Sequence, residues 1–442
     1  MSLPYYVDPI YPCKQISIDK EWLRTVMNHP MFQRLKDIGQ TSCADYLFIA
    51  HRHSRYEHSL GTGYLAKRVC AGFDIDNSLK DKLVFASICH DLGHGPFSHS
   101  LEYFVLPKLG IHDFCHEAYS VEIANKIYDT IPDPGFDIDN LGEILNNGGR
   151  NLDNEVFNLV SNKSFGVDVD RADYMVRDSY LLGIDLGLEL DKLFGGFVLE
   201  KAANGKSFVL ALRADVVPLF HHFIRMRYLM FEHLYTQPLT TGRNLLVARL
   251  LCEADPYLKL STRVKTLTEF VGLTDHILQE ALKLKNKNDR LDKTIKLVEY
   301  NQAYHFCVEF EMKDEQIKNQ TSKFMHEYTE TLKDKILGPE FAQKEDVEVY
   351  FAKIDSFKDT DYDNIAIKHN GQLLKLPEYL ERAELEPLER RVFRRFRVFA
   401  LTEDLVDSVL DKFKQFEKAH EDQIINVNYD PMIYDLYRAL GK

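Results

Sequence analysis

The chain has 442 residues, 45% of them hydrophobic and 28% charged, which is an ordinary globular composition and long enough for more than one packed core. A formal net charge of −13 argues against a dedicated nucleic-acid-binding protein, because it would repel a polyanion at long range. No apolar run reaches the roughly 18–20 residues of a membrane span, and the start of the chain lacks a secretory signal, so we predict an intracellular, cytoplasmic protein with no membrane partner.

Helical periodicity dominates the first part of the chain. The stretches LKDKLVFASICH (79–90) and VVPLFHHFIRMRYLMFEHLY (216–235) repeat apolar residues at three- and four-residue spacing, which is the pattern of amphipathic helices. We therefore predict an all-α core within residues 1–255.

Residues 51–65, HRHSRYEHSLGTGYL, crowd three histidines and two arginines into their first eight positions and then pass into glycine and apolar residues. We interpret the later part of this segment as a helix with His58 near its start. A function for these titratable groups is indicated only when the segment is combined with two motifs further along the chain.

The next motif is SICHDLGHGPFSHSLE (87–102), where an apolar helix ends on His90 and Asp91. Adjacent His and Asp do not share one helical face, but both can converge on a single ion at a helix end. Glycines at positions 93 and 95 break the helix and let the backbone approach closely. His94 and His99 follow within two turns.

A third motif, GVDVDRADYMVRDSYLLGI (166–184), places four polar residues on one helical face, at offsets of 0, 4, 7 and 8. That face is polar where a core stripe would be apolar. The four residues are Asp170, Tyr174, Arg177 and Asp178.

Together the three motifs supply two imidazoles and two carboxylates, from His58, His90, Asp91 and Asp170. Mixed nitrogen and oxygen ligands suit iron(II), manganese or zinc and leave positions open for water and substrate. Any one of these histidines alone is more simply a core or surface residue. The ordered combination, with two members at helix ends beside glycines, favours a metal site.

Two further regions complete the predicted architecture. Residues 194–212 predict a hairpin around Asn204-Gly205, inserted on the helices. Residues 256–442 are lysine-rich and mix amphipathic helices with the strand-like segments YHFCVEFEM and EVYFAKI, which indicates a smaller α+β region with a regulatory or oligomerisation role. The predicted fold is mainly α, with a helical core, a small hairpin insertion and this C-terminal region.

The run ERRVFRRFRVF (389–399) is the one concentrated basic segment. Leu388, Val392 and Phe396 fall four apart, so we predict an amphipathic helix with a solvated arginine face. Two alternatives remain open: a phosphate-binding edge at a subunit interface, and a secondary single-stranded nucleic-acid-binding activity, since basic residues alternate with aromatic ones.

Several motifs together resemble a known family: FQRLKDIGQ, SRYEHSLGTGYLA, CHDLGHGPFSH, HEAYS, VSNKSFGVDVDRADYMVRD and GIDLGLELD. They are similar to those of the HD-domain metal-dependent phosphohydrolases, in the branch of deoxynucleoside triphosphate (dNTP) triphosphohydrolases, over residues 4 to about 255. The resemblance implies an HD-type helical core. It also implies hydrolysis of a dNTP substrate to a deoxynucleoside and inorganic triphosphate, and a homo-oligomer, dimer or tetramer.

The resemblance carries over residue by residue. It makes His58, His90, Asp91 and Asp170 the ligands of one divalent transition metal, iron, manganese or zinc, with Mg²⁺ accompanying the substrate phosphates. The residues implied around the attacked phosphate are His94, His99, His116 and Arg55, with His99 as the first candidate for the proton donor and His116 as the second. The residues implied to contact the rest of the substrate are Gln40, Arg55, Tyr174, Arg177, Asp178, Arg227 and Phe231.

The chain departs from the family pattern at two places. Arg227 and Phe231 stand where the relatives use histidine and tyrosine near the base, so we expect different base recognition. In the pocket where relatives bind an activating nucleotide, an amide replaces the acidic residue that reads guanine, so the choice of activator is expected to change. The residues of that pocket are Asn28, Gln33, Arg34 and Lys36, and Arg34 is equally well explained as a surface salt-bridge partner.

Two other functions stay open at this point. The metal-ligand set alone is equally compatible with another HD-type nucleotide phosphatase or phosphodiesterase. A non-enzymatic alternative is a nucleotide sensor or single-stranded nucleic-acid-binding protein, although such a protein has no need to keep the metal ligands together with His94, His99 and His116.

Overall fold

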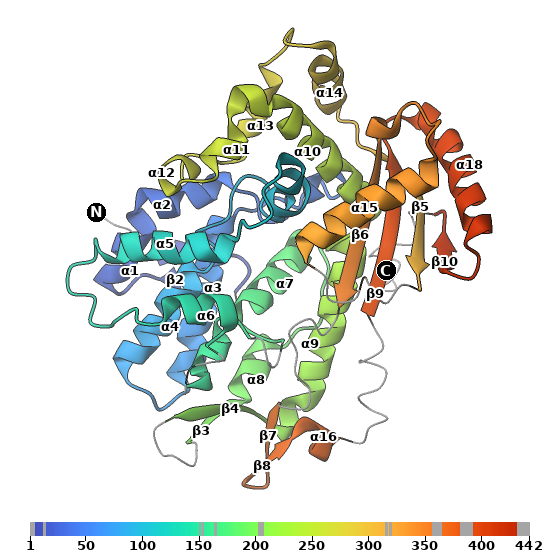
Figure 1. The fold of residues 1–442 in the computed structure, drawn as a ribbon. Coiled ribbons are helices and arrows are strands. Elements are labelled where there is room, and N and C mark those ends of the chain that lie inside the picture. Colours follow the sequence, from blue (N-terminus) through green and yellow to red (C-terminus); the bar gives the residue numbers. More distant parts are fainter. Residues whose placement is uncertain are drawn as a thin grey trace.

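The computed structural model describes residues 5–11, 15–149, 152, 154–162, 166–201, 207–313, 317, 321–355, 365–380 and 392–430. Helices dominate these residues, and small sheets lie beside and below them (Figure 1). The predicted class, a mainly helical core with a hairpin and a smaller α+β region, is confirmed.

The helical body is built by the first part of the chain and continues past residue 255. Its main helices are α1 (Glu21–Asn28), α2 (Pro30–Gln33), α3 (Arg55–Ala71), α4 (Asn77–Cys89), α5 (His116–Tyr128), α6 (Leu141–Asn147), α7 (Val169–Leu181), α8 (Leu190–Gly195), α9 (Val217–Met230) and α10 (Pro238–Leu258). Four more follow: α11 (Leu260–Arg263), α12 (Leu267–Phe270), α13 (Ile277–Leu282) and α14 (Asp289–Glu299). No helix in the described ranges joins sufficient length to sufficient hydropathy to cross a bilayer.

Side-chain caps fix where the site-bearing helices begin. Ser54 and Glu57 form a capping box at the start of α3, where Glu57 accepts from the backbone N–H of Ser54 at 2.9 Å. Asp168 caps α7 by accepting from the backbone N–H of Arg171 at 2.8 Å. Such caps satisfy amide groups that the first helical turn leaves without partners. They therefore set the exact turn of each helix on which the polar residues stand.

The predicted hairpin is confirmed and is part of a larger sheet. β3 (Phe197–Lys201) pairs antiparallel with β4 (Phe208–Arg213), and its Asn204-Gly205 turn lies outside the described residues. β4 also pairs in parallel with β7 (Ala366–His369), which pairs with β8 (Gln372–Lys375). Two strands from the C-terminal region thus complete a sheet that the sequence suggested only as an isolated hairpin. A further small sheet near the start of the chain joins β1 (Tyr5–Val7) to β2 (Gln15–Ser17).

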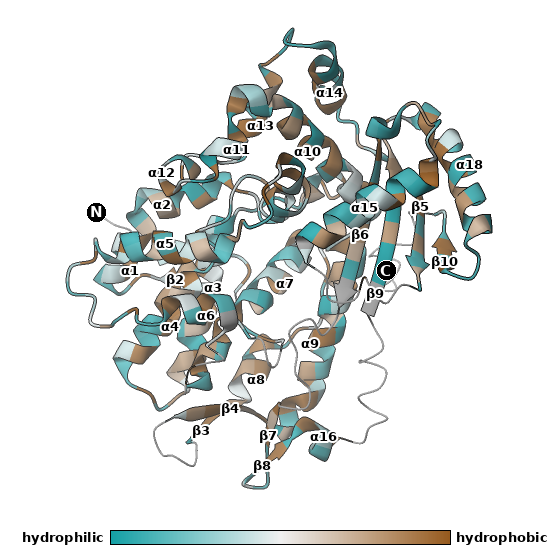
Figure 2. Cartoon of the chain, viewed as in Figure 1, coloured by the Kyte–Doolittle hydropathy of each residue, from teal (hydrophilic) through white to brown (hydrophobic). Residues whose placement is uncertain are grey.

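A second four-stranded sheet forms the C-terminal lobe, which we define as residues 305–355 and 392–428. Its strand order is β10 (Ile424–Asn428), β5 (His305–Met312), β9 (Val392–Ala400) and β6 (Val347–Asp355), all antiparallel. The helices α15 (Ser322–Leu337) and α18 (Glu403–Ala419) pack on it. Figure 2 shows hydrophilic and hydrophobic positions alternating around α18, which buries Leu405, Val409, Phe413 and Phe416. The strands predicted at 304–312 and 348–354 are confirmed.

The helix predicted at residues 389–399 is wrong. Residues 392–400 form β9, the strand between β5 and β6, and residues 389–391 lie outside the described part of the chain. A spacing of four residues satisfies a strand period of two as well as a helical period near 3.6, so the spacing of apolar residues could not distinguish the two. Arg397 is fully buried, donates from Nε to Glu309 at 2.6 Å and also bonds the carbonyl of Thr236, so it joins the sheet to the helical body.

The predicted domain boundary at residue 255 stays a prediction. α10 runs across it, and residues of the later helices, such as Phe270, Leu291 and Ile295, share one continuous core with the helical body. A separate core lies between the C-terminal sheet and its two helices.

Gly93 allows α5 to approach the turn after α4. A Cβ at this position would lie 1.9 Å from the carbonyl oxygen of His116 and 2.5 Å from the backbone nitrogen of Ser120, so Gly93→Ala forces backbone apart. We expect it to destabilise the protein by about 1–3 kcal/mol. Chemical denaturation should show the loss, and Gly195→Ala, where nothing lies within 4 Å of the added carbon, should stay near wild type.

Candidate functional site

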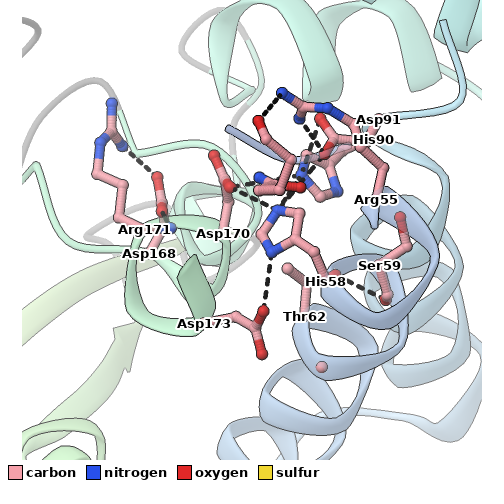
Figure 3. Close-up of polar contacts among 12 residues, drawn as sticks. Arg55, His58, Ser59, Thr62, His90, Asp91, Asp168, Asp170, Arg171 and Asp173 are labelled. Atoms are coloured by element: carbon pink, nitrogen blue, oxygen red, sulfur yellow. Dashed lines mark hydrogen bonds and ion pairs between the residues drawn. The ribbon is translucent and has the colours of Figure 1, made fainter. Parts of the chain in front are cut away.

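The four predicted metal ligands lie together at the meeting point of three helices. His58 is in the first turn of α3, His90 and Asp91 follow the last residue of α4, and Asp170 is in the first turn of α7. Figure 3 shows these side chains pointing toward one another from separate parts of the ribbon. The caps of α3 and α7 therefore place side chains from positions 58 and 170, far apart in sequence, at one point.

The donor atoms have the separations expected around one ion. Nε2 of His58 lies 3.3 Å from Nε2 of His90, 3.1 Å from Oδ1 of Asp170 and 3.5 Å from Oδ2 of Asp91. Nε2 of His90 lies 3.3 Å from Asp91 and 3.4 Å from Asp170. Two donors about 2.1 Å from a common ion are about 3.0 Å apart at a right angle and about 3.4 Å at the tetrahedral angle. These residues fit a divalent metal.

The second ring nitrogen of each histidine, Nδ1, has a hydrogen-bond partner of the kind found in metal sites. Nδ1 of His58 is 2.8 Å from Oδ2 of Asp173, and Nδ1 of His90 is 2.7 Å from the carbonyl oxygen of Ser87. Both partners are hydrogen-bond acceptors, which assigns the ring proton to Nδ1 as the donor and leaves the Nε2 lone pair for a ligand bond. Asp173 was not among the residues predicted from the sequence.

Charge is balanced within this cluster. Burial raises the pKa of Asp91, but Arg55 and His90 outweigh it, and the pKa falls well below its usual value. Burial also raises the pKa of Asp170, but His90 and His58 outweigh it, and this pKa too falls well below its usual value. Both carboxylates are therefore ionised at neutral pH, which is the state that a cation needs.

A second cluster lies beside the first and contains the predicted catalytic histidines. The rings of His94 and His116 stack with centroids 3.9 Å apart, and the ring of His99 stands 4.8 Å from that of His94. The carboxylate of Glu102 joins Nδ1 of His99 at 2.9 Å to Nδ1 of His116 at 2.8 Å. Sequence reasoning missed Glu102, although its i+3 spacing from His99 is a signal that could have found it.

The Glu102 carboxylate also sets the charge of this cluster. Burial lowers the pKa of His116, but Glu102 outweighs it and the pKa is raised. The pKa of His94, by contrast, is well below its usual value because of burial, Arg55 and His116. Of the two stacked rings, His116 therefore holds a second proton more readily than His94 does.

Both clusters open into a cavity of about 660 Å³. The predicted residues on its wall are Gln40, Arg55, His90, Asp91, His94, His99, His116, Asp170, Tyr174, Asp178, Arg227 and Phe231. His58 lies behind this wall and is fully buried. Two π-helical turns, Leu101–Val105 and Phe231–Tyr235, contribute to the wall, a geometry that is frequent at functional sites.

The C-terminal lobe closes the other side of the cavity. Met325, His326, Thr329 and Glu330 of α15 line it, as do residues 348–351 and 353 of β6. In Figure 1, α15 lies alongside β6 at this place. The sequence suggested a regulatory or oligomerisation role for this region, and the structure adds a direct contribution to the site.

Arg227 is the cavity residue whose bonding is least complete. Its side chain is only 4% exposed, and Nε and Nη1 are buried with no hydrogen-bond partner among the described residues. Its guanidinium lies 5.5 Å from the ring centroid of Phe231. Burying a charged donor without a partner is unfavourable, so this group is suited to an anion that enters the cavity.

The sequence predicted that Arg177 and Asp178 contact the substrate from the same helical face as Asp170, but in the structure both bond other residues of the protein. Arg177 is not on the cavity wall in the described structure, because its guanidinium bonds Asp173 on its own helix and Asp8 near the start of the chain. Asp178 is on the wall, but its carboxylate already accepts from three side chains. These are His51 at 3.1 Å, His53 at 2.6 Å and Tyr235 at 2.6 Å.

The four residues of the predicted regulatory pocket do not line this cavity in the described structure. Arg34 is buried and donates to the carbonyl oxygens of Leu92, His94 and Leu273 at 2.7–3.2 Å, so it supports the turn that carries His94. The others are Asn28, which is exposed; Gln33, which bonds the carbonyl of Met27; and Lys36, whose ammonium lies 4.7 Å from the ring centroid of Tyr56.

Comparison with known proteins places this site within a described domain. Residues 55–175 match the family model of the HD domain, and the four clustered ligands lie inside that match. The chain contains an HD domain, and this domain implies a divalent metal.

The chain is also related to curated triphosphohydrolases. It is 28% identical over 310 residues to "Deoxynucleoside triphosphate triphosphohydrolase SAMHD1 homolog" of Dictyostelium discoideum, covering 67% of this chain and 59% of the relative. "Deoxynucleoside triphosphate triphosphohydrolase SAMHD1" of Mus musculus is 26% identical over 350 residues (67% and 53%), and that of Bos taurus 27% over 342 residues (67% and 58%). The chain thus spans between half and three fifths of the length of these relatives.

We expect His90→Ala and Asp91→Ala each to lose the bound divalent metal, because each removes a donor atom that lies within 3.5 Å of Nε2 of His58. Metal analysis of the purified proteins should show about one ion per wild-type chain and a small fraction of that in the variants. His276→Ala, which changes a histidine whose side chain is 71% exposed outside the cluster, should keep its metal. A full complement of metal in either ligand variant would contradict the assignment.

Proposed function

We propose, from the premise that this HD-domain protein is related to dNTP triphosphohydrolases, that it hydrolyses dNTPs with a divalent metal and releases a deoxynucleoside and inorganic triphosphate. The observation that carries the proposal is the cavity itself. It holds the His and Asp donors near one part of its wall and the buried, incompletely bonded guanidinium of Arg227 at another. A ligand with several negative charges would satisfy both.

Binding of the triphosphate would use cations that the wall already provides. Arg55 bonds Asp91 and, through Nε, Ser98 at 2.7 Å, so its guanidinium is held next to the metal donors. Arg171 is held on the same helix as Asp170 by its bond to Asp168. Fixed cations of this kind neutralise charge on phosphate without having to reorganise during the reaction.

The reaction would be attack of water on the α-phosphorus, which breaks the bond to the 5′ oxygen of the deoxynucleoside. The metal, when bound, supplies Lewis-acid activation of water and phosphate. Glu102 holds Nδ1 of both His99 and His116, which leaves Nε2 of each ring for the substrate. His99 would donate the proton that the leaving oxygen needs, with His116 as second candidate.

Selection of a deoxyribose would depend on Tyr174. Its ring lies on the cavity wall, 6.5 Å from that of His58, and this position supports a contact with the sugar that would follow the α-phosphate. A ring packed against the 2′ carbon leaves no room for a 2′ hydroxyl. Gln40, whose Oε1 is buried without a partner among the described residues, would accept from the sugar.

Other features of the relatives remain proposals for this chain. Activation by a nucleotide at Asn28, Gln33, Arg34 and Lys36, and assembly into a dimer or tetramer, would be tested separately. The nucleic-acid-binding alternative loses support, because Arg395 and Arg397 of β9 are used in ion pairs with Glu309 rather than on an open basic face.

Incubation with each of the four dNTPs, followed by separation of the phosphate products, tests the reaction. We expect triphosphate and deoxynucleoside in equal amounts, and negligible turnover of the ribonucleotides. Orthophosphate or pyrophosphate as the inorganic product would favour another HD-type phosphatase or phosphodiesterase. Addition of other nucleotides to the same assay reports whether an activator is needed.

Arg227→Met tests the role of the buried guanidinium. Loss of a charged contact to phosphate should raise KM about 10- to 100-fold. The unliganded variant should be at least as stable to heat as wild type, because it no longer buries a donor without a partner. Arg225→Met, on the exposed side of the same helix, should change neither value. An unaltered KM in Arg227→Met would contradict phosphate binding at this residue.

A further inference from the structure

We infer that the segment before β2 is part of the metal centre: Tyr11 and Asp8 hold the carboxylate of Asp173 in the orientation that positions His58. The inference rests on the metal centre of the proposed function but concerns residues that neither the sequence motifs nor the matched domain includes, since the HD match begins at residue 55.

Asp173 accepts from four donor groups. Oδ2 faces Nδ1 of His58 at 2.8 Å and Nε of Arg177 at 2.9 Å. Oδ1 faces Nη2 of Arg177 at 3.0 Å and the hydroxyl of Tyr11, which donates to it. Figure 3 shows Asp173 below the His58 ring, on the side away from the other donors. A carboxylate has about four acceptor positions, so this one is fully used.

The start of the chain supplies two of the groups that fix this arrangement. The hydroxyl of Tyr11 also lies 3.3 Å from the carbonyl oxygen of Gly61, one turn after His58. Asp8 accepts from Nη2 of Arg177 at 2.9 Å and thereby keeps the guanidinium against Asp173. Both residues are buried, at 4% and 6% exposure, so neither contact is screened by water.

Asp173 is fully buried against α3. A Cβ added to Gly61 would lie 1.8 Å from Oδ1 of Asp173 and 2.5 Å from Nη2 of Arg177, so only glycine allows α3 to pack here. Its protein donors therefore fix the orientation of this carboxylate. Removal of the Tyr11 hydroxyl leaves Oδ1 with Arg177 alone and weakens the restraint that keeps Oδ2 on His58.

The consequence for a metal follows from the role of such carboxylates. A carboxylate on the second nitrogen of a ligand histidine fixes its tautomer and makes the other nitrogen a better donor, and its loss typically weakens metal affinity about 10- to 100-fold. Asp173, Arg177 and Asp8 carry one net negative charge in this cluster, which favours a cation on the far side of the His58 ring.

The test is the Mn²⁺ affinity of the full chain, measured by competition with a chelator in the absence of nucleotide. We expect Tyr11→Phe to weaken Mn²⁺ binding about 10-fold and Asp173→Asn about 100-fold. Tyr64→Phe is the matched control, because its ring lies 4.4 Å from that of Tyr11 while its hydroxyl accepts from Arg68 at 3.0 Å, away from Asp173. It should bind Mn²⁺ as wild type does.

A purely structural role makes a different prediction. In that case Tyr11→Phe lowers the unfolding temperature of the metal-free protein but leaves the Mn²⁺ affinity of the folded chain within twofold of wild type, and this result overturns the inference. If Asp173→Asn fails to fold, the Tyr11→Phe comparison decides alone. The binding readout separates the two proposals. If the wild-type protein does not hydrolyse dNTPs but Tyr11→Phe still weakens Mn²⁺ binding, the proposed function is refuted and this inference stands. Absence of Mn²⁺ binding by wild type would refute the inference.

Discussion

The structure depends on keeping several ionisable groups buried within contact of one another. His58, His90, Asp91 and Asp170 bring two carboxylates and two imidazoles to one point. An isolated charge in such a place is strongly unfavourable, and it persists only when partners surround it. The neighbouring elements meet this demand with Arg55 from α3, the Ser87 carbonyl from α4 and Asp173 from α7. The same side-chain contacts therefore hold α3, α4 and α7 together and form the site.

The need of buried charges for partners also explains why residues 51–58 contain so many titratable groups. His51 and His53 reach Asp178 on α7, Arg55 reaches Asp91 after α4, and His58 faces Asp170 and Asp173. His51, His53, Arg55 and His58 thus connect the start of α3 to α7 and to the turn after α4, whereas the exposed Arg52 pairs with Asp45. The run is a set of cross-links rather than a single binding patch.

Sequence reasoning selected four ligand candidates at helix ends marked by caps and glycines, and the structure brings these four side chains together. Their role as ligands stays a prediction. Sequence reasoning failed where one pattern fits two structures, as at β9, where a four-residue spacing suits a strand and a helix alike. It also missed Glu102 and Asp173, since the helical face of a residue does not show which neighbour its carboxylate will meet. Pairing between β4 and β7, which are over a hundred residues apart, leaves no local trace in either strand.

The C-terminal lobe is attached to the rest of the molecule at several separate places. Arg397 of β9 bonds the carbonyl of Thr236, and Lys108 pairs with Glu348 of β6. Between β6 and β9 the chain also contributes β7, which pairs with β4. A rigid-body movement of the lobe away from the helical body would have to break contacts at separate places. The topology of the chain therefore holds α15 and β6 against their side of the cavity.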